Sequence, residues 1–165
     1  MNYWEGRKHL DYYRVAMSLV IGESILDVGA GTQSGCQYLL TLPKSVSMRH
    51  TIERGPDRGI RLPGVVHHFR DFHRWDVARS YDTVTCMQAI EHVERPAEFS
   101  ARLFRCASQR VIISIPYRWT TGSDSHRDLD EGTLRLWTGR EPIGTDISGD
   151  NLLRMVAWYD AASPP

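Results

Sequence analysis

Apolar and polar positions along the chain follow two periods, and each period predicts one kind of secondary structure. Apolar residues spaced three or four apart predict helices, and short runs rich in β-branched or aromatic residues predict strands. On these patterns we expect strands at residues 25–28, 45–52, 65–69, 81–87, 110–115, 143–147 and 152–158. We expect helices at residues 5–20, 33–42, 96–106 and 130–137.

The order of these elements predicts an α/β fold. Strands that alternate with helices form a parallel sheet with right-handed crossovers. The run 110–115 is apolar throughout, as expected for a strand that is covered on both faces. The last two strands are expected to close the sheet as an antiparallel pair. Ligands of such sheets bind at the carboxyl ends of the strands. The residues expected at that edge are Asp27, Glu53, Asp71 and Gln88.

Length and charge narrow the class of protein. At 165 residues without repeats or linkers, we expect one domain over 1–165, with a cap helix at 1–20 and the core fold at 21–160. Lys and Arg number 20, as do Asp and Glu, so the chain has no basic field for nucleic acid. No run reaches the ~20 apolar residues of a membrane span. The start is unlike a signal peptide, and three scattered cysteines indicate reduced thiols, so we expect a cytoplasmic protein.

The segment 25–35, which reads ILDVGAGTQSG, carries the strongest chemical signal. A strand that ends in a glycine-rich turn brings bare backbone close to a ligand, and the following helix presents free N–H groups there. Glycines in a tight turn can also be purely structural. Asp27, just before the first glycine, is of the right type to take a ligand's ammonium group, whereas it would repel a pyrophosphate.

The sequence LDVGAGTQSG resembles motif I of the class I S-adenosylmethionine-dependent methyltransferases, usually Asp/Glu-x-Gly-x-Gly-x-Gly. Here Gln33 stands in place of the third glycine, and Gly35 follows two residues late. The resemblance implies a Rossmann-like seven-stranded sheet in the order 3-2-1-4-5-7-6 with a minimal lid. It also implies a set of motif I residues that bind S-adenosylmethionine, namely Asp27, Gly29, Ala30 and Gly31.

Two further acidic positions match the same family. Glu53 directly follows the second expected strand, at the position where the family's acid takes both ribose hydroxyls. The alternative for Glu53 is a surface acid paired with Arg49 or Arg54. Asp71 and Phe72 follow the third strand, where the resemblance implies contacts to the adenine amino group and ring. A turn aspartate beside a core phenylalanine is the alternative.

The segment YDTVTCMQAIEHVERP resembles FDxVxxxxxLEHxxxP of small class I methyltransferases. The resemblance implies that Met87 and Gln88 line the methionine arm of the cofactor, and that Glu91 and His92 stand where the methyl acceptor enters. Histidine titrates near neutral pH, so His92 could remove a proton from a hydroxyl or amine. In the structural alternative, the dipole at a helix start favours Glu91, and His92 is a packed imidazole.

A metal site is possible by residue type but is not predicted. Glu91, His92 and His126 mix carboxylate and imidazole, which suits a divalent metal. The set is similar to the metal-holding Glu-x-x-Glu-His and later His of small-RNA 2′-O-methyltransferases, but Gln88 replaces the first glutamate. A neutral amide is a poor ligand for a hard cation. We therefore expect no metal.

The resemblances together imply an S-adenosylmethionine-dependent methyltransferase that releases S-adenosylhomocysteine. The expected acceptor is an O or N atom of a small molecule or metabolite, with His92 and Glu91 as the catalytic residues. A homodimer or a partner chain could supply the lid. Two alternatives stay open. One is a 2′-O-methyltransferase of RNA ends, and the other is a non-catalytic methyltransferase-like binding or scaffold subunit.

Overall fold

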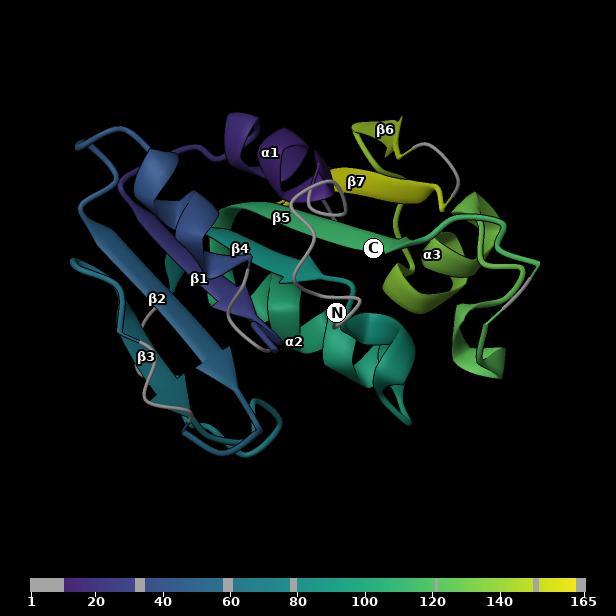
Figure 1. The fold of residues 1–165 in the computed structure, drawn as a ribbon, viewed down its shortest axis with the longest axis horizontal. Coiled ribbons are helices and arrows are strands. Elements are labelled where there is room, and N and C mark those ends of the chain that lie inside the picture. The colour runs from purple at the N-terminus through teal and green to yellow at the C-terminus, as the bar shows by residue number, and fades with distance from the viewer. Residues whose placement is uncertain are drawn as a thin grey trace, which may run out of the picture.

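One seven-stranded sheet in the order β3-β2-β1-β4-β5-β7-β6 forms the centre of the molecule (Figure 1). The computed structural model describes residues 11–31, 35–57, 61–77, 80–120, 122–149 and 152–162. The strands are β1 (Ser24–Val28), β2 (Met48–Glu53), β3 (Val66–Phe69), β4 (Tyr81–Met87), β5 (Ala107–Pro116), β6 (Gly144–Ser148) and β7 (Arg154–Asp160). The α-helices are α1 (Asp11–Ser18), α2 (Pro96–Cys106) and α3 (Glu131–Thr138), and the 3₁₀ helices are η3 (Cys36–Thr41), η4 (Ile90–His92) and η5 (Asp124–His126).

The strand directions divide the sheet into two parts. β1 to β5 pair in parallel, whereas β7 runs antiparallel to both β5 and β6. β1 lies between β2 and β4, and Val28 stands opposite both Ile52 and Cys86. The predicted fold class, strand order and closing antiparallel pair are confirmed.

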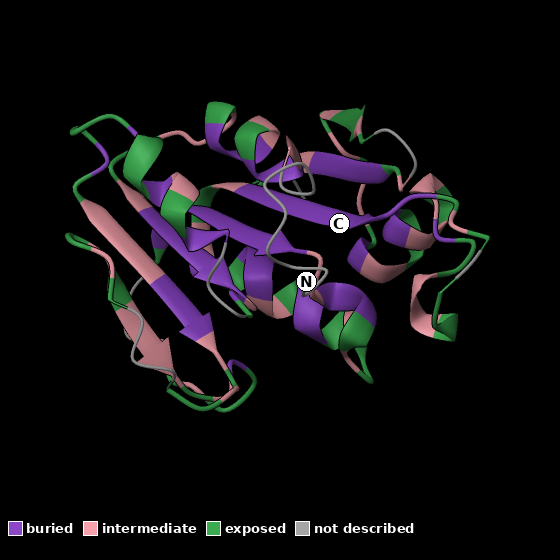
Figure 2. Cartoon of the chain, viewed as in Figure 1, coloured by how far each residue is buried: buried purple, intermediate pink, exposed green. Residues whose placement is uncertain are grey.

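Two apolar layers cover the sheet, one on each face. One layer contains the buried side of α2, with Phe99 and Leu103, and Leu134 of α3. The other contains Ala16 of α1 and Leu39 of η3. Figure 2 shows the central strands as almost wholly buried, with exposed residues on the outer helices and loops. The ends of the strands therefore lie at a rigid edge.

Local sequence signals explain where two helices begin and end. Pro96 occupies the first turn of α2, where its missing N–H has no partner to lose. Asp130 caps α3 by accepting from the backbone N–H of Thr133 at 2.9 Å. Gly139 ends α3 in the left-handed region, with φ +64°. Both helices match the sequence prediction within one residue.

The element after the glycine turn differs from its prediction. A helix over 33–42 was expected, and the structure shows the 3₁₀ helix η3, with residues 32–34 outside the described residues. The helix is short, and its N-cap residue, Gly35, offers no side-chain hydrogen bond. Pro43 comes directly after the C-cap Leu42, which limits the number of i→i−4 bonds that could form. Of the expected cap helix, residues 11–20 are described, and within them α1 ends two residues early, at Ser18; residues 1–10 lie outside the described residues.

The structure also shows the state of the cysteines and the lengths of the described helices. All three cysteines are buried free thiols. Among the described residues, no helix is long and apolar enough to cross a membrane.

Candidate functional site

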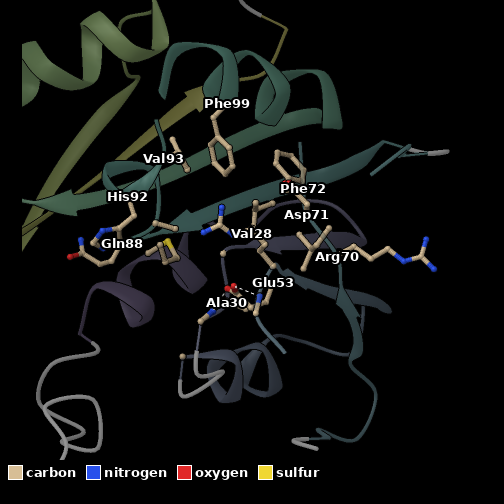
Figure 3. Close-up of a pocket in the computed structure, with 18 of the residues that line it drawn as sticks. Val28, Ala30, Glu53, Arg70, Asp71, Phe72, Gln88, His92, Val93 and Phe99 are labelled. Carbon is tan, nitrogen blue, oxygen red and sulfur yellow. Dashed lines mark hydrogen bonds between the residues drawn. The ribbon is translucent and has the colours of Figure 1, made fainter. Parts of the chain in front are cut away.

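A cavity of about 440 Å³ opens at the carboxyl ends of β1, β2, β3 and β4 (Figure 3). Nine of the eleven predicted site residues line it, and these are Gly29, Ala30, Gly31, Glu53, Asp71, Phe72, Met87, Gln88 and His92. The other two, Asp27 and Glu91, are buried beside the cavity and are not part of its wall. Figure 3 shows His92 and Gln88 at one end, and Asp71 and Phe72 at the other.

The glycine turn after β1 has the backbone that its sequence predicts. Gly29 and Gly31 have φ values of +79° and +57°, in the region where a side chain is strained. A Cβ on Gly29 would lie 2.5 Å from the Cβ of Ala89, so this glycine is needed for packing against the segment after β4. The turn therefore presents backbone to the cavity and cannot easily carry side chains.

Glu53 ties this turn to the end of β2. Its Oε2 accepts from the backbone N–H of Gly31 at 2.7 Å, and its Oε1 accepts from that of Gly55 at 2.9 Å. Arg49 does not pair with it, because that guanidinium donates to backbone carbonyls before β2. A carboxylate has about four acceptor positions, and these bonds use two of them. Glu53 thus keeps the capacity to accept from two ligand hydroxyls.

The residues after β3 form the wall of the cavity at the end opposite His92 and Gln88. Asp71 accepts from the backbone N–H of His73 at 2.9 Å, as turn aspartates do. Phe72 is buried and meets Phe99 edge-to-face, with ring centres 5.2 Å apart. Both side chains make contacts within the fold, and both also border the cavity. Phe99 is a lining residue that the sequence reasoning missed, since nothing separates it from the other apolar positions of α2.

Asp27 lies underneath the site. Its Oδ2 accepts from the Tyr13 hydroxyl at 3.0 Å, and its Oδ1 accepts from the Thr85 hydroxyl at 2.7 Å. Burial raises the pKa of Asp27 to about 6, against the lowering effect of these two hydrogen bonds. Tyr13 itself lines the cavity. Two hydroxyls of the protein, from Tyr13 and Thr85, therefore meet the carboxylate in this structure.

Three side chains from η4 and η5 gather at the other end of the site. Nε2 of His92 lies 3.2 Å from Nε2 of His126 and 4.0 Å from Oε1 of Glu91. The Glu91 side chain is 1% exposed, and neither of its oxygens has a hydrogen-bond partner within the described part of the chain. Burial raises the pKa of Glu91 to about 8. Burial lowers the pKa values of both histidines.

These three residues offer metal-ligand atoms within 4.8 Å of one another. Gln88, the fourth position considered in the sequence, is turned elsewhere: its side-chain amide and its backbone N–H both donate to the Ser114 hydroxyl, at 3.3 and 3.1 Å. Gln88 also has a positive φ of 53°, which is strained for a residue other than glycine. It thus shapes the cavity wall, and its side-chain N–H is engaged by Ser114.

The described part of the cap predicted at residues 1–20 contributes two aromatic side chains to the cavity wall. Tyr12 and Tyr13 of α1 border the cavity. Tyr3, Trp4 and Arg7 lie outside the described residues.

Solved structures share this fold. The N-methyltransferase NodS from Bradyrhizobium japonicum WM9, in complex with S-adenosylhomocysteine, has a TM-score of 0.73 at 13% identity and covers 98% of this chain and 89% of its own. Magnesium protoporphyrin IX methyltransferase from Synechocystis PCC 6803, with bound S-adenosylmethionine, has a TM-score of 0.68 at 14% identity and covers 97% and 84%. No protein-family model and no curated protein matches the sequence. At these identities the likeness is one of architecture, and the chain has the fold of the class I S-adenosylmethionine-dependent methyltransferases.

Proposed function

We propose that this protein is an S-adenosylmethionine-dependent methyltransferase that acts on an oxygen or nitrogen atom of a small-molecule acceptor. The observation that carries the proposal is the position and hydrogen bonding of the Glu53 carboxylate. Its carboxylate is fixed in the cavity wall by two backbone N–H groups, one of them from the glycine turn, and it retains acceptor positions for two hydroxyls. The structures with this fold include ones with S-adenosylmethionine or S-adenosylhomocysteine bound.

The residues that line the cavity would meet the parts of this cofactor in order. Glu53 would hold the ribose, and Asp71 and Phe72 would meet the adenine. Met87 and Gln88 would line the methionine arm. The bare turn at Gly29, Ala30 and Gly31 lets the cofactor approach the backbone. These residues come from the ends of four neighbouring strands, as expected for a ligand at this edge.

The cofactor supplies the electrophilic methyl group and the leaving group. The chain has to align the acceptor, exclude water and take a proton. His92 lines the end of the cavity away from Asp71 and is half exposed there. Because burial lowers its pKa, the imidazole is neutral at pH 7 and can act as a base. Glu91 stands behind His92 and would orient it, so we treat it as a positioning residue.

Calorimetry with S-adenosylhomocysteine tests the proposal. We expect saturable binding, and we expect Glu53→Gln to weaken it by roughly 1–3 kcal/mol, the usual loss for hydrogen bonds to a charged group. Glu98→Gln is the matched control, since Glu98 is an exposed carboxylate on α2. A folded protein that binds no S-adenosylhomocysteine would refute the enzyme and favour a scaffold subunit.

A second candidate keeps the cofactor and replaces the acceptor with an RNA end. The gathering of Glu91, His92 and His126 favours it, since these groups could hold a divalent metal at the acceptor end. The zero net charge argues against it, because phosphate binding relies on basic residues. A steep salt dependence of RNA binding would support this candidate.

A further inference from the structure

The helix α1 is fastened to the strand that leads into the glycine turn by a buried hydrogen bond. The Tyr13 hydroxyl donates to Oδ2 of Asp27 at 3.0 Å, and both side chains are buried. Thr85 of β4 donates to the other oxygen. Both oxygens of Asp27 therefore accept hydrogen bonds from the protein. The donor on α1, Tyr13, also lines the cavity.

The ring of Tyr13 makes a second attachment, to the start of η3. A Cβ on Gly35 would lie 2.1 Å from Cε2 of Tyr13, so the ring occupies the space that any side chain there would need. The ring also stacks on Tyr38, with centres 6.0 Å apart and planes 16° apart. This contact explains the late glycine of the motif, because Gly35 leaves room for Tyr13.

The neighbouring Tyr12 connects α1 to strand β7. The guanidinium of Arg154 on β7 lies 5.3 Å from the centre of the Tyr12 ring and 5.2 Å from that of Trp119. Tyr12 and Tyr13 are adjacent and tilted against each other, with centres 5.1 Å apart. The two tyrosines thus extend from the glycine turn to β7 and form one wall of the cavity.

We propose that Tyr13 and Asp27 are a positioning pair that holds α1 in place as a wall of the cofactor cavity. This inference rests on the proposed function, and it assigns Asp27 a different task from the direct contact with a ligand ammonium that the sequence suggested. In the paired arrangement, the carboxylate acts through Tyr13. In the direct arrangement, the Tyr13 hydroxyl would compete with the ligand for it.

The pair gives cofactor binding a dependence on pH. The titratable groups that face Asp27 are Tyr13 from α1, Cys36 from η3, Glu53 from β2 and Cys86 from β4. Burial raises the pKa values of Tyr13, Cys36 and Cys86, so these three stay neutral from pH 5 to 8. Asp27 is ionised above its pKa of about 6. Below that pH a neutral carboxyl replaces the charge-assisted acceptor, and the bond to Tyr13 weakens.

The experiment is calorimetry with S-adenosylhomocysteine from pH 5 to 8 on the full chain. For Tyr13→Phe we expect roughly tenfold weaker binding at pH 7.5, the typical worth of a hydrogen bond to a charged group. Asp27→Asn should bind at pH 7.5 about as weakly as the wild type does at pH 5, and its affinity should depend less on pH. Tyr81→Phe is the matched control: it removes a buried hydroxyl that bonds His50 outside the cavity, and it should bind normally.

Three results separate the possibilities. Unchanged or tighter binding by Tyr13→Phe would refute the pair and favour direct contact between Asp27 and the ligand. Equal losses in Tyr13→Phe and Tyr81→Phe would reduce the effect to general destabilisation, which also overturns the inference. A wild-type protein that does not bind at any pH would refute the proposed function itself.

Discussion

The buried carboxyl of Glu91 should make the stability of the protein depend on pH in a direction that the structure fixes. The side chain is 1% exposed, and burial raises its pKa from 4.5 to about 8. Between these two values the folded protein keeps a proton that the unfolded chain releases. The free energy of unfolding therefore falls as pH rises, by up to about 1.4 kcal/mol per pH unit.

In the window from pH 6.5 to 8, Glu91 is expected to make the largest contribution, and comparison with Glu91→Gln separates it from the rest. The folded-state pKa values of His67, His68, His92 and His126 are lowered, so these histidines affect stability mainly below pH 6.5. Allowing for partial ionisation near pH 8, we expect the wild type to lose about 1.5 kcal/mol across the window. Glu91→Gln keeps the shape of the side chain without the proton and should lose much less.

The measurement is urea unfolding at half-unit steps of pH, with a chelator present throughout. Glu98→Gln, which removes an exposed carboxylate of α2, should follow the wild type. If the wild type and Glu91→Gln have the same slope, the Glu91 carboxylate is already ionised in the folded protein. The positive charge of Arg154, which lowers the pKa of Glu91, would then outweigh burial, and our reasoning would be wrong.

Three further outcomes test other parts of the site. Gly29→Val should destabilise the fold by more than about 1 kcal/mol in urea unfolding, because its Cβ meets Ala89 at a positive φ; normal stability would contradict this contact. His92→Ala should keep its affinity for S-adenosylhomocysteine but lose about 10²–10⁴-fold in kcat with any acceptor found by screening. Full turnover by this variant would show that His92 is not a catalytic base and that alignment of the acceptor accounts for the rate. Added Mn²⁺ or Mg²⁺ should leave the melting temperature unchanged, because the Gln88 amide is turned to Ser114; a rise that His126→Ala abolishes would establish a metal site.

The sequence predicts the sheet well because local patterns and strand alternation determine it. β4 and α2 have the predicted boundaries, and the sheet order follows from the family resemblance. The same resemblance identifies nine of the residues that line the cavity, since these stand at strand ends whose positions a linear motif can mark.

Side-chain burial and long-range partners were not predictable in the same way. Asp27 was expected to face a ligand, and the structure pairs it with Tyr13, fourteen residues earlier on another element. Glu91 was expected to stand where the methyl acceptor enters, with a place at a helix start as the structural alternative, and it lies buried in a 3₁₀ turn without hydrogen-bond partners among the described residues. Neither the pairing of Asp27 nor the burial of Glu91 leaves a periodic signal in the sequence, because each depends on how separate elements pack.

The place of β1 between β2 and β4 also has a consequence for folding kinetics. β1 and β4 pair through Val28 and Cys86, which are far apart in the chain, so a long loop must close before this pairing forms. The cavity lies where the two strands end, and partly folded chains that lack this pairing have no such cavity. A ligand of the cavity would therefore bind the native topology alone, and at 100 times its Kd it would add about 2.7 kcal/mol to the free energy of unfolding.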